Sequence, residues 1–192
     1  MRRLFVALAM PEAVGEKLSL LLHGVPDARW VAPENFHLTL RFIGEVDGGA
    51  AEEITYALSR IRVPSFCLTL EGLGCFETRG RLRAIWVGAR ENPALAGLQR
   101  KVESALVAAG IPAEGRKFKP HVTLARFSGM PVAAAAPYIA SHAAIRLEPF
   151  EVESFFLFES KLGHGGPTYF PECEVPLVLS APSLSDAALA ER

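Results

Sequence analysis

Two short segments of this chain repeat the same order of histidine and threonine. The first is His-Leu-Thr-Leu-Arg-Phe at 37–42, and the second is His-Val-Thr-Leu-Ala-Arg-Phe at 121–127. In a strand, alternate side chains point to the same face, so histidine and threonine share one face and the apolar neighbours take the other. We therefore expect His37, Thr39, His121 and Thr123 to line a cleft in front of the core.

These residue types suit the cleavage of a phosphodiester. The reaction needs a base that activates water and an acid that protonates the leaving alkoxide, and two imidazoles with a pKa near 6.5 can supply one of each. The threonine hydroxyls can donate hydrogen bonds to the non-bridging phosphate oxygens. A nearby arginine can offset the negative charge that develops in the transition state.

Two arginines are candidates for that role. Arg126 is preferred, because a guanidinium binds phosphate with two parallel hydrogen bonds. Strict alternation places Arg126 on the face opposite His121, so the strand must end or bulge there. Arg41 is in register with His37 and Thr39, and it is the alternative.

Other interpretations of these residues predict different chemistry. A strand histidine or threonine is often only structural. Clustered histidines can also bind a metal, but neither motif has a carboxylate or cysteine at ligand spacing, so no metal site is expected. Cys67 or Cys75 as a nucleophile stays open, although buried inert thiols are far more common.

The composition favours a globular intracellular protein. The chain has 192 residues, of which 50% are hydrophobic, and a net charge of −1, so no global basic field holds long nucleic acid. The three cysteines form no Cys-x-x-Cys pair, which fits a reducing cytoplasm. The apolar run after Met1-Arg2-Arg3 is too short for a membrane span, and it predicts a strand that leads into a helix.

The periodicity predicts strands and helices that alternate along the chain. Several strands lie too close together for helical crossovers, so we expect a mixed, largely antiparallel α+β fold. Residues 1–178 are predicted to form one domain, and residues 179–192 a flexible tail. The segment 72–83 carries Arg79, Arg81 and Arg83, and it is either a solvated hairpin or a loop over the phosphate site. The predicted strands cover 3–9, 37–43, 66–70, 84–87, 121–127, 152–159 and 169–178, and the main helices run from Pro11 to Gly24, from Gly49 to Ile61 and from Pro93 to Gly110.

The longer motifs resemble those of the 2H phosphoesterase superfamily, and most closely the RNA 2′,3′-cyclic phosphodiesterases, also called 2′-5′ RNA ligases. The similarity spans about residues 3–178. It rests on Trp30-Val-Ala-Pro-Glu-Asn-Phe-His-Leu-Thr-Leu-Arg-Phe-Ile-Gly44, on Phe118-Lys-Pro-His-Val-Thr-Leu-Ala-Arg126, on the opening strand with Pro11, and on Glu159-Ser160 with Gly166-Pro-Thr-Tyr169.

The resemblance implies a bilobal fold, with two pseudo-symmetric lobes around a central cleft, and no metal or cofactor. It implies hydrolysis of a 2′,3′-cyclic phosphate at an RNA end to a 2′-phosphomonoester, with some capacity to join 2′-5′ linkages. His37 and His121 would be the acid–base pair; the near-symmetric motifs do not distinguish the acid from the base, and we take His37 as proton donor and His121 as proton acceptor. Thr39 and Thr123 would hold phosphate oxygens, and Arg126 matches the phosphate-binding arginine of the family.

Two alternative functions stay open from the sequence. One is a phosphodiesterase for a small cyclic nucleotide, and the other is a nucleotide- or RNA-binding module without turnover. The basic residues in the segments 79–83 and 116–119 favour RNA as the substrate if both segments lie at the rim of the cleft. We expect a cytoplasmic monomer with no membrane contact. The basic residues are Arg79, Arg81, Arg83, Arg116, Lys117 and Lys119.

Overall fold

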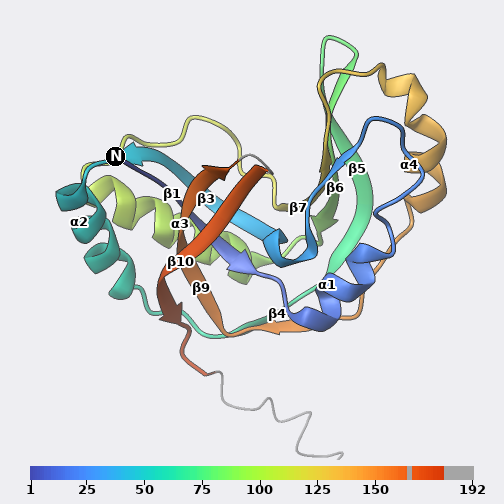
Figure 1. Cartoon of the computed structure of the whole chain (residues 1–192). Helices are drawn as coiled ribbons and strands as arrows, with labels where there is room; N and C mark the ends of the chain where they lie inside the picture. Colours follow the sequence, from blue (N-terminus) through green and yellow to red (C-terminus); the bar gives the residue numbers. More distant parts are fainter. Residues whose placement is uncertain (164–165, 180–192) are drawn as a thin grey trace, which may run out of the picture.

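The computed structural model describes residues 1–163 and 166–179 of the chain (Figure 1). Its strands are β1 (Arg2–Ala9), β2 (Arg29–Trp30), β3 (His37–Val46), β4 (Phe66–Leu68), β5 (Leu70–Thr78), β6 (Arg81–Ala89), β7 (His121–Arg126), β8 (Phe150–Val152), β9 (Ser154–Gly163) and β10 (Gly166–Pro176). Its helices are α1 (Glu12–Ser19), α2 (Gly48–Ser59), α3 (Pro93–Ala108) and α4 (Ala136–His142), with the 3₁₀ turns η1 (Pro33–Asn35) and η2 (Val132–Ala134).

One antiparallel sheet runs through both halves of the molecule. Its order is β10-β9-β1-β3-β7-β6-β5, with the short strand β2 also paired to β7, while β4 and β8 form a separate ribbon. The halves meet where β3 lies beside β7, at the register pair Leu38 and Val122. Helices α2 and α3 lie at one end of the molecule, and α1 and α4 lie at the other (Figure 1). The predicted α+β, largely antiparallel architecture is confirmed.

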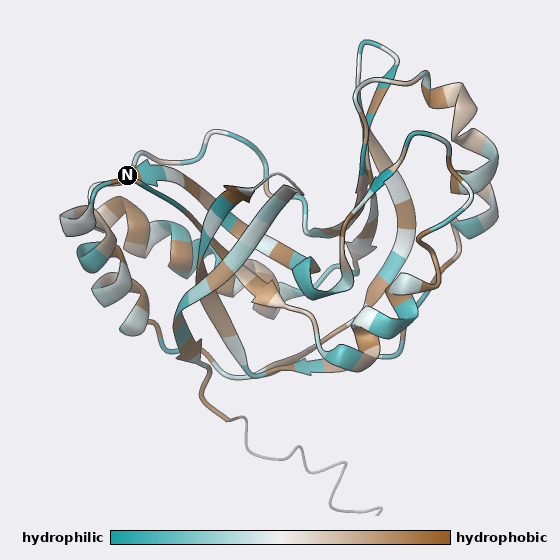
Figure 2. Cartoon of the chain, viewed as in Figure 1, coloured by the Kyte–Doolittle hydropathy of each residue, from teal (hydrophilic) through white to brown (hydrophobic). Residues whose placement is uncertain are grey.

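The apolar residues of the two histidine strands lie in the core, as the alternation predicts. Leu38, Leu40, Val122 and Leu124 are all buried, and burial of such side chains is worth about 1.5–3 kcal/mol each. Helix α3 packs against β3 and α2, and α4 packs against β5. In Figure 2 the strands carry brown apolar stretches, whereas the tip of the β5–β6 hairpin is paler and teal. The core therefore fixes the backbone from which the polar face of β3 and β7 projects.

Helix ends follow the local sequence closely in one case and depart from it in another. Asn92 caps α3, since its Oδ1 accepts hydrogen bonds from the amides of Ala94 and Leu95. The first helix ends at Ser19 rather than at Gly24, because the chain tightens into turns after Leu18. No helix within the described ranges is long and apolar enough to cross a membrane.

The strand boundaries also differ from the expected ones. Strand β3 continues past Gly44, whose positive φ of 95° is accommodated within the strand, and it ends at Val46. The segment 72–83 is mostly paired, because β5 and β6 form a long hairpin that turns at Arg79 and Gly80. Residues 180–192, which make up most of the predicted tail, lie outside the described residues.

Candidate active site

The two motif histidines share the same backbone anchor. His37 Nδ1–H donates to the carbonyl of Asn35 at 2.7 Å, and His121 Nδ1–H donates to the carbonyl of Lys119 at 2.6 Å. In each case the acceptor is the second residue before the histidine. With Nδ1 occupied as a donor, the neutral ring keeps its lone pair on Nε2. Each imidazole is therefore prepared to accept or donate a proton at Nε2.

The pairing of β3 with β7 brings the two motifs together. Leu38 is the register partner of Val122, so the polar residues on either side of each apolar residue become neighbours on one face of the sheet. The charges of Arg126 and of a protonated His121 both lower the pKa of His37. The structure thus brings His37, Thr39, His121 and Thr123 to one place, as predicted.

A bulge in each histidine strand decides which arginine joins them. In β7, Thr123 pairs with Trp86 and Ala125 pairs with Ile85, so Leu124 is an extra residue without a partner. This extra residue reverses the alternation after it. Arg126 therefore returns to the face of the histidines, and it lines a pocket of about 310 Å³ together with His37 and Thr39. The predicted bulge is confirmed.

A corresponding bulge in β3 moves the alternative arginine away from the site. In β3, Thr39 pairs with Ala7 and Arg41 pairs with Val6, so Leu40 is the extra residue. The expectation that Arg41 shares the face of His37 is wrong, because it assumed unbroken alternation. Arg41 is only 8% exposed on the opposite side of the sheet, where its Nε donates to Glu103 Oε2 at 2.6 Å.

Arg41 instead holds the segment that leads to the second motif. Besides Glu103, its guanidinium lies 3.6 Å from Glu114 and donates to the carbonyls of Phe42 and Pro112. These partners tie β3 to α3 and to the loop that follows α3. The role of Arg41 is therefore structural, and Arg126 is the motif arginine that lines the pocket beside His37.

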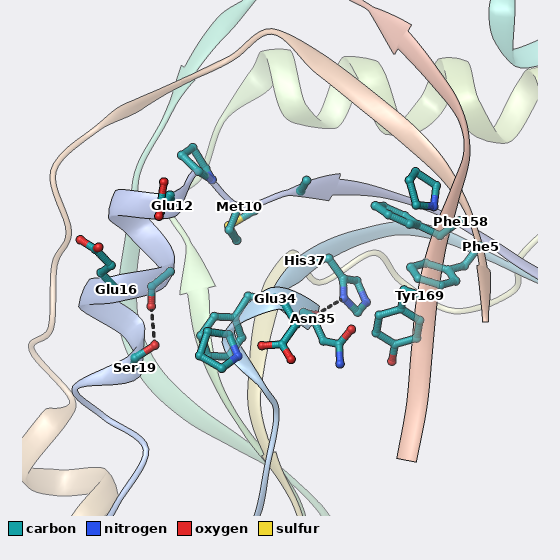
Figure 3. Close-up of a pocket in the computed structure, with 16 residues that line it drawn as sticks. Phe5, Met10, Glu12, Glu16, Ser19, Glu34, Asn35, His37, Phe158 and Tyr169 are labelled. Atoms are coloured by element: carbon teal, nitrogen blue, oxygen red, sulfur yellow. Dashed lines mark hydrogen bonds between the residues drawn. The ribbon is translucent and has the colours of Figure 1, made fainter. Parts of the chain in front are cut away.

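Aromatic rings pack against one side of His37. Its ring centroid lies 5.0 Å from that of Phe5 and 5.0 Å from that of Tyr169, with Tyr169 in an edge-on orientation. Figure 3 shows Phe5, Phe158 and Tyr169 together on one side of the imidazole. These residues come from β1, β9 and β10, the three strands beyond β3.

A second aromatic wall stands beside His121. Phe76 lies edge-on to the imidazole with centroids 4.8 Å apart, and Trp86 lies 5.9 Å away. Lys119 Nζ sits 4.4 Å above the centre of the Trp86 ring, in a cation–π contact. Trp86 has room only because residue 74 is glycine, since a Cβ there would lie 2.4 Å from the indole.

Burial lowers the proton affinity of both histidines. The pKa of His37 is lowered to about 4, mainly by loss of hydration and additionally by the charges of Arg126 and His121, against the raising effect of the hydrogen bond to the Asn35 carbonyl. Loss of hydration is also the main cause that lowers the pKa of His121, with Lys119 and Arg126 adding to it. Both imidazoles are therefore held neutral in the free protein at neutral pH.

The basic residues that were predicted near the cleft differ in their contacts. Lys119 contacts the wall beside His121, whereas Arg116 pairs with Glu114 and Arg81 donates to the carbonyl of Gly129. Burial raises the pKa of the Cys75 thiol, which opposes a role as a nucleophile. In the described ranges, no group of three or more His, Cys, Asp or Glu side chains gathers where it could hold a metal ion.

Sequence reasoning missed the aromatic residues around the histidines. Phe5, Tyr169, Phe76 and Trp86 lie far from the motifs in the chain, and only the strand pairing places them. One local signal was available, because the residue two before each histidine supplies the carbonyl that orients it. Asn35 belongs to η1, a 3₁₀ turn that directs this carbonyl back toward the ring.

Comparison with known proteins gives a consistent result. The family model described as LigT-like phosphoesterase matches twice, at residues 8–86 and 87–169, in keeping with two similar halves. The RNA 2′,3′-cyclic phosphodiesterase of Aeropyrum pernix is 39% identical over 148 residues, which cover 76% of this chain and 84% of that protein. The crystal structure of Escherichia coli LigT in its apo form has a TM-score of 0.76 and 30% identity, covering 92% of this chain and 98% of that one. The same protein complexed with 3′-AMP has a TM-score of 0.74, with the same identity and coverage.

Proposed function

This chain belongs to the LigT-like phosphoesterase family, and on that premise we propose that it hydrolyses the 2′,3′-cyclic phosphate at an RNA end to a 2′-phosphomonoester. The observation that carries the proposal is the pair of imidazoles on adjacent strands. Each is fixed through Nδ1 by the carbonyl two residues before it, and Arg126 reaches the same face. The relative from Aeropyrum pernix is named for this activity.

The reaction follows from two proton transfers. His121 accepts a proton from water, the water oxygen bonds to phosphorus, the bond from phosphorus to O3′ breaks, and His37 donates a proton to the departing O3′. Thr39 and Thr123 donate hydrogen bonds to the non-bridging oxygens. Arg126 compensates the charge that accumulates on those oxygens in the transition state. The product keeps the phosphate on O2′.

Because the pKa of His37 is lowered, substrate binding must promote the protonation of this proton donor. An anionic phosphodiester next to the imidazole favours its charged form, which opposes the effect of burial. The protonated state of His37 then forms together with the complex. Because of this coupling, His37 can act as a general acid only when a phosphate is bound beside it.

The proposal includes the setting in which the enzyme works. We infer a monomer in the cytoplasm, and the free thiols of Cys67, Cys75 and Cys173 support a reducing compartment. Light scattering during size-exclusion chromatography measures the mass of the particle directly. A mass of one chain is expected, and a mass of two chains contradicts the monomer.

The test compares wild type, His37→Ala and His121→Ala on an oligoribonucleotide that ends in a 2′,3′-cyclic phosphate, in excess EDTA. We expect wild type to form the 2′-phosphate, and each variant to be slower by about 10² or more. Circular dichroism checks that both variants are folded. A 3′-phosphate product contradicts the proposed bond cleavage, and bound RNA without turnover in wild type supports a binding module instead.

A further inference from the structure

Two pockets of opposite charge meet at His37. The larger pocket measures about 820 Å³ and the smaller about 310 Å³, and both are lined by His37, Phe5 and Tyr169. Among the described residues, the charged side chains that line the larger pocket are all acidic. Those that line the smaller pocket are both arginines. The acidic side chains are Glu12, Glu16 and Glu34, and the arginines are Arg3 and Arg126.

The acidic side chains come from two elements that flank the opening. Glu12 and Glu16 lie one turn apart on α1, and Glu34 lies on the 3₁₀ turn just before His37. In Figure 3, Glu12 and Glu16 lie across from the aromatic group of Phe5, Phe158 and Tyr169, with Met10 between, and Glu34 lies beside Asn35 near His37. The larger pocket therefore has a carboxylate side and an apolar, aromatic side.

This charge pattern orients a nucleotide within the site. A phosphate is attracted to the arginines of the smaller pocket and repelled by the carboxylates of the larger one. The part of the substrate that enters the larger pocket must therefore be uncharged. A volume of about 820 Å³ lies within the range of small-molecule sites and accommodates a nucleoside.

A nucleobase matches both sides of the larger pocket. Its flat faces stack on aromatic side chains, and an exocyclic amino group donates a hydrogen bond to a carboxylate. Cytosine, adenine and guanine carry such an amino group, whereas uracil presents a carbonyl oxygen instead. A carboxylate that faces this oxygen leaves two acceptors opposed, which is unfavourable.

We propose that the larger pocket receives the base of the terminal nucleotide, and that Glu12, Glu16 and Glu34 make the enzyme prefer bases with an exocyclic amino group over uracil. This inference rests on the proposed function, because it takes the reacting phosphate to lie between His37 and Arg126. It assigns a specificity role to residues outside the two histidine motifs.

The test uses cytidine and uridine 2′,3′-cyclic monophosphates, which differ at position 4 of the same ring. We expect kcat/KM of wild type to be about tenfold higher for the cytidine substrate. The triple variant Glu12→Gln/Glu16→Gln/Glu34→Gln should lower this ratio toward one, mainly by slowing the cytidine reaction. Glu52→Gln on the exposed surface of α2 is the matched control, and it should leave the ratio unchanged.

A binding measurement separates this inference from the proposed activity. Calorimetric titration with the 2′-monophosphates of cytidine and uridine reports base preference without turnover. Tighter binding of the cytidine compound, lost in the triple variant, supports the base site even if wild type hydrolyses neither cyclic substrate. Equal hydrolysis and equal binding of both pairs by wild type overturn the base site while leaving the hydrolase intact.

Discussion

Phe42 on β3 and Arg126 on β7 occupy equivalent positions, since each is the fifth residue after its histidine and follows a bulge at the same place in the strand. Both line the smaller pocket beside His37. The two halves thus repeat the histidine, the threonine and the bulge, but at this position only the second half carries a guanidinium, while the other arginine of the pocket, Arg3, comes from β1. The two motifs therefore differ in charge at an equivalent position of a nearly symmetric frame.

The two arginines of the motifs should respond to mutation in opposite ways. Arg126→Ala removes the guanidinium from the pocket, so we expect kcat/KM to fall by about 10²–10³ with little change in stability. Arg41→Ala leaves Glu103 without its ion-pair partner and Glu114 with Arg116 alone, and we expect a loss of about 2 kcal/mol in the free energy of unfolding. Urea unfolding and steady-state kinetics on both variants measure the two effects. Reversed effects would show that the bulge assignment is wrong.

The acidity of His37 can be followed directly. Titration by NMR of its ring protons should give a pKa of about 4 in the free protein, because the ring is desolvated. Inorganic phosphate should raise this pKa, since an anion beside the imidazole favours the protonated form. A pKa near 6.5 without phosphate would contradict the buried environment of His37. A pKa that does not change when phosphate is added would contradict the proposed protonation of His37 on substrate binding.

The same shift predicts how stability depends on pH. The unfolded chain protonates His37 below about pH 6.5, whereas the folded chain does so only near pH 4. In this window the unfolded state binds more protons, so the free energy of unfolding falls as the pH falls, by about 3 kcal/mol from this residue. Denaturation of wild type and His37→Gln at several pH values measures it. The variant should show the shallower dependence, and parallel curves would argue against a neutral buried His37.

The glycine beneath Trp86 should be critical for the wall beside His121. Gly74→Ala places a Cβ 2.4 Å from the indole, so Trp86 must move and the His121 ring loses its packing. A misplacement of about 1 Å in a catalytic group can reduce the rate by about 10², so we expect a loss of that order. Near-ultraviolet circular dichroism reports the Trp86 environment beside the kinetic assay.

A matched glycine tests whether the effect is local. Gly97 lies in α3, where a Cβ would meet only the Arg100 side chain at 3.9 Å. Gly97→Ala should preserve activity and add up to about 1 kcal/mol of stability, because alanine favours the helix. If both variants were equally impaired, the proposed contact between Gly74 and Trp86 would not explain the loss.

The histidine motifs could be predicted because their chemistry is local. His37 and Thr39 are two residues apart, and the period of a strand alone places them on one face. The arginines show where this reasoning stops. Alternation fails at Leu40 and Leu124, because the extra residues are defined by pairing with β1 and β6, which are distant in the chain. Local sequence cannot report such a register.

The surroundings of the histidines were beyond prediction for a related reason. Phe5, Tyr169 and Trp86 are ordinary apolar strand residues when they are considered alone. Their contacts with His37 and His121 depend on which strands become neighbours. The carboxylates of α1 likewise gain meaning only when the helix lies across from the aromatic residues of β9 and β10. Long-range pairing, rather than residue type, creates these parts of the site.

The identical backbone anchors of His37 and His121 have a consequence for the direction of the chemistry. Neither ring is committed by its carbonyl partner to giving or taking the proton. By microscopic reversibility, the path that opens a cyclic phosphate also serves in the opposite sense, with the roles of the two rings exchanged. A 5′-hydroxyl that replaces water as nucleophile would lose its proton to the same base as water does and yield a 2′-5′ linkage, whereas cleavage of that linkage would use the exchanged roles. The choice between cutting and joining would be kinetic competition between water and that hydroxyl, not a property of the histidines.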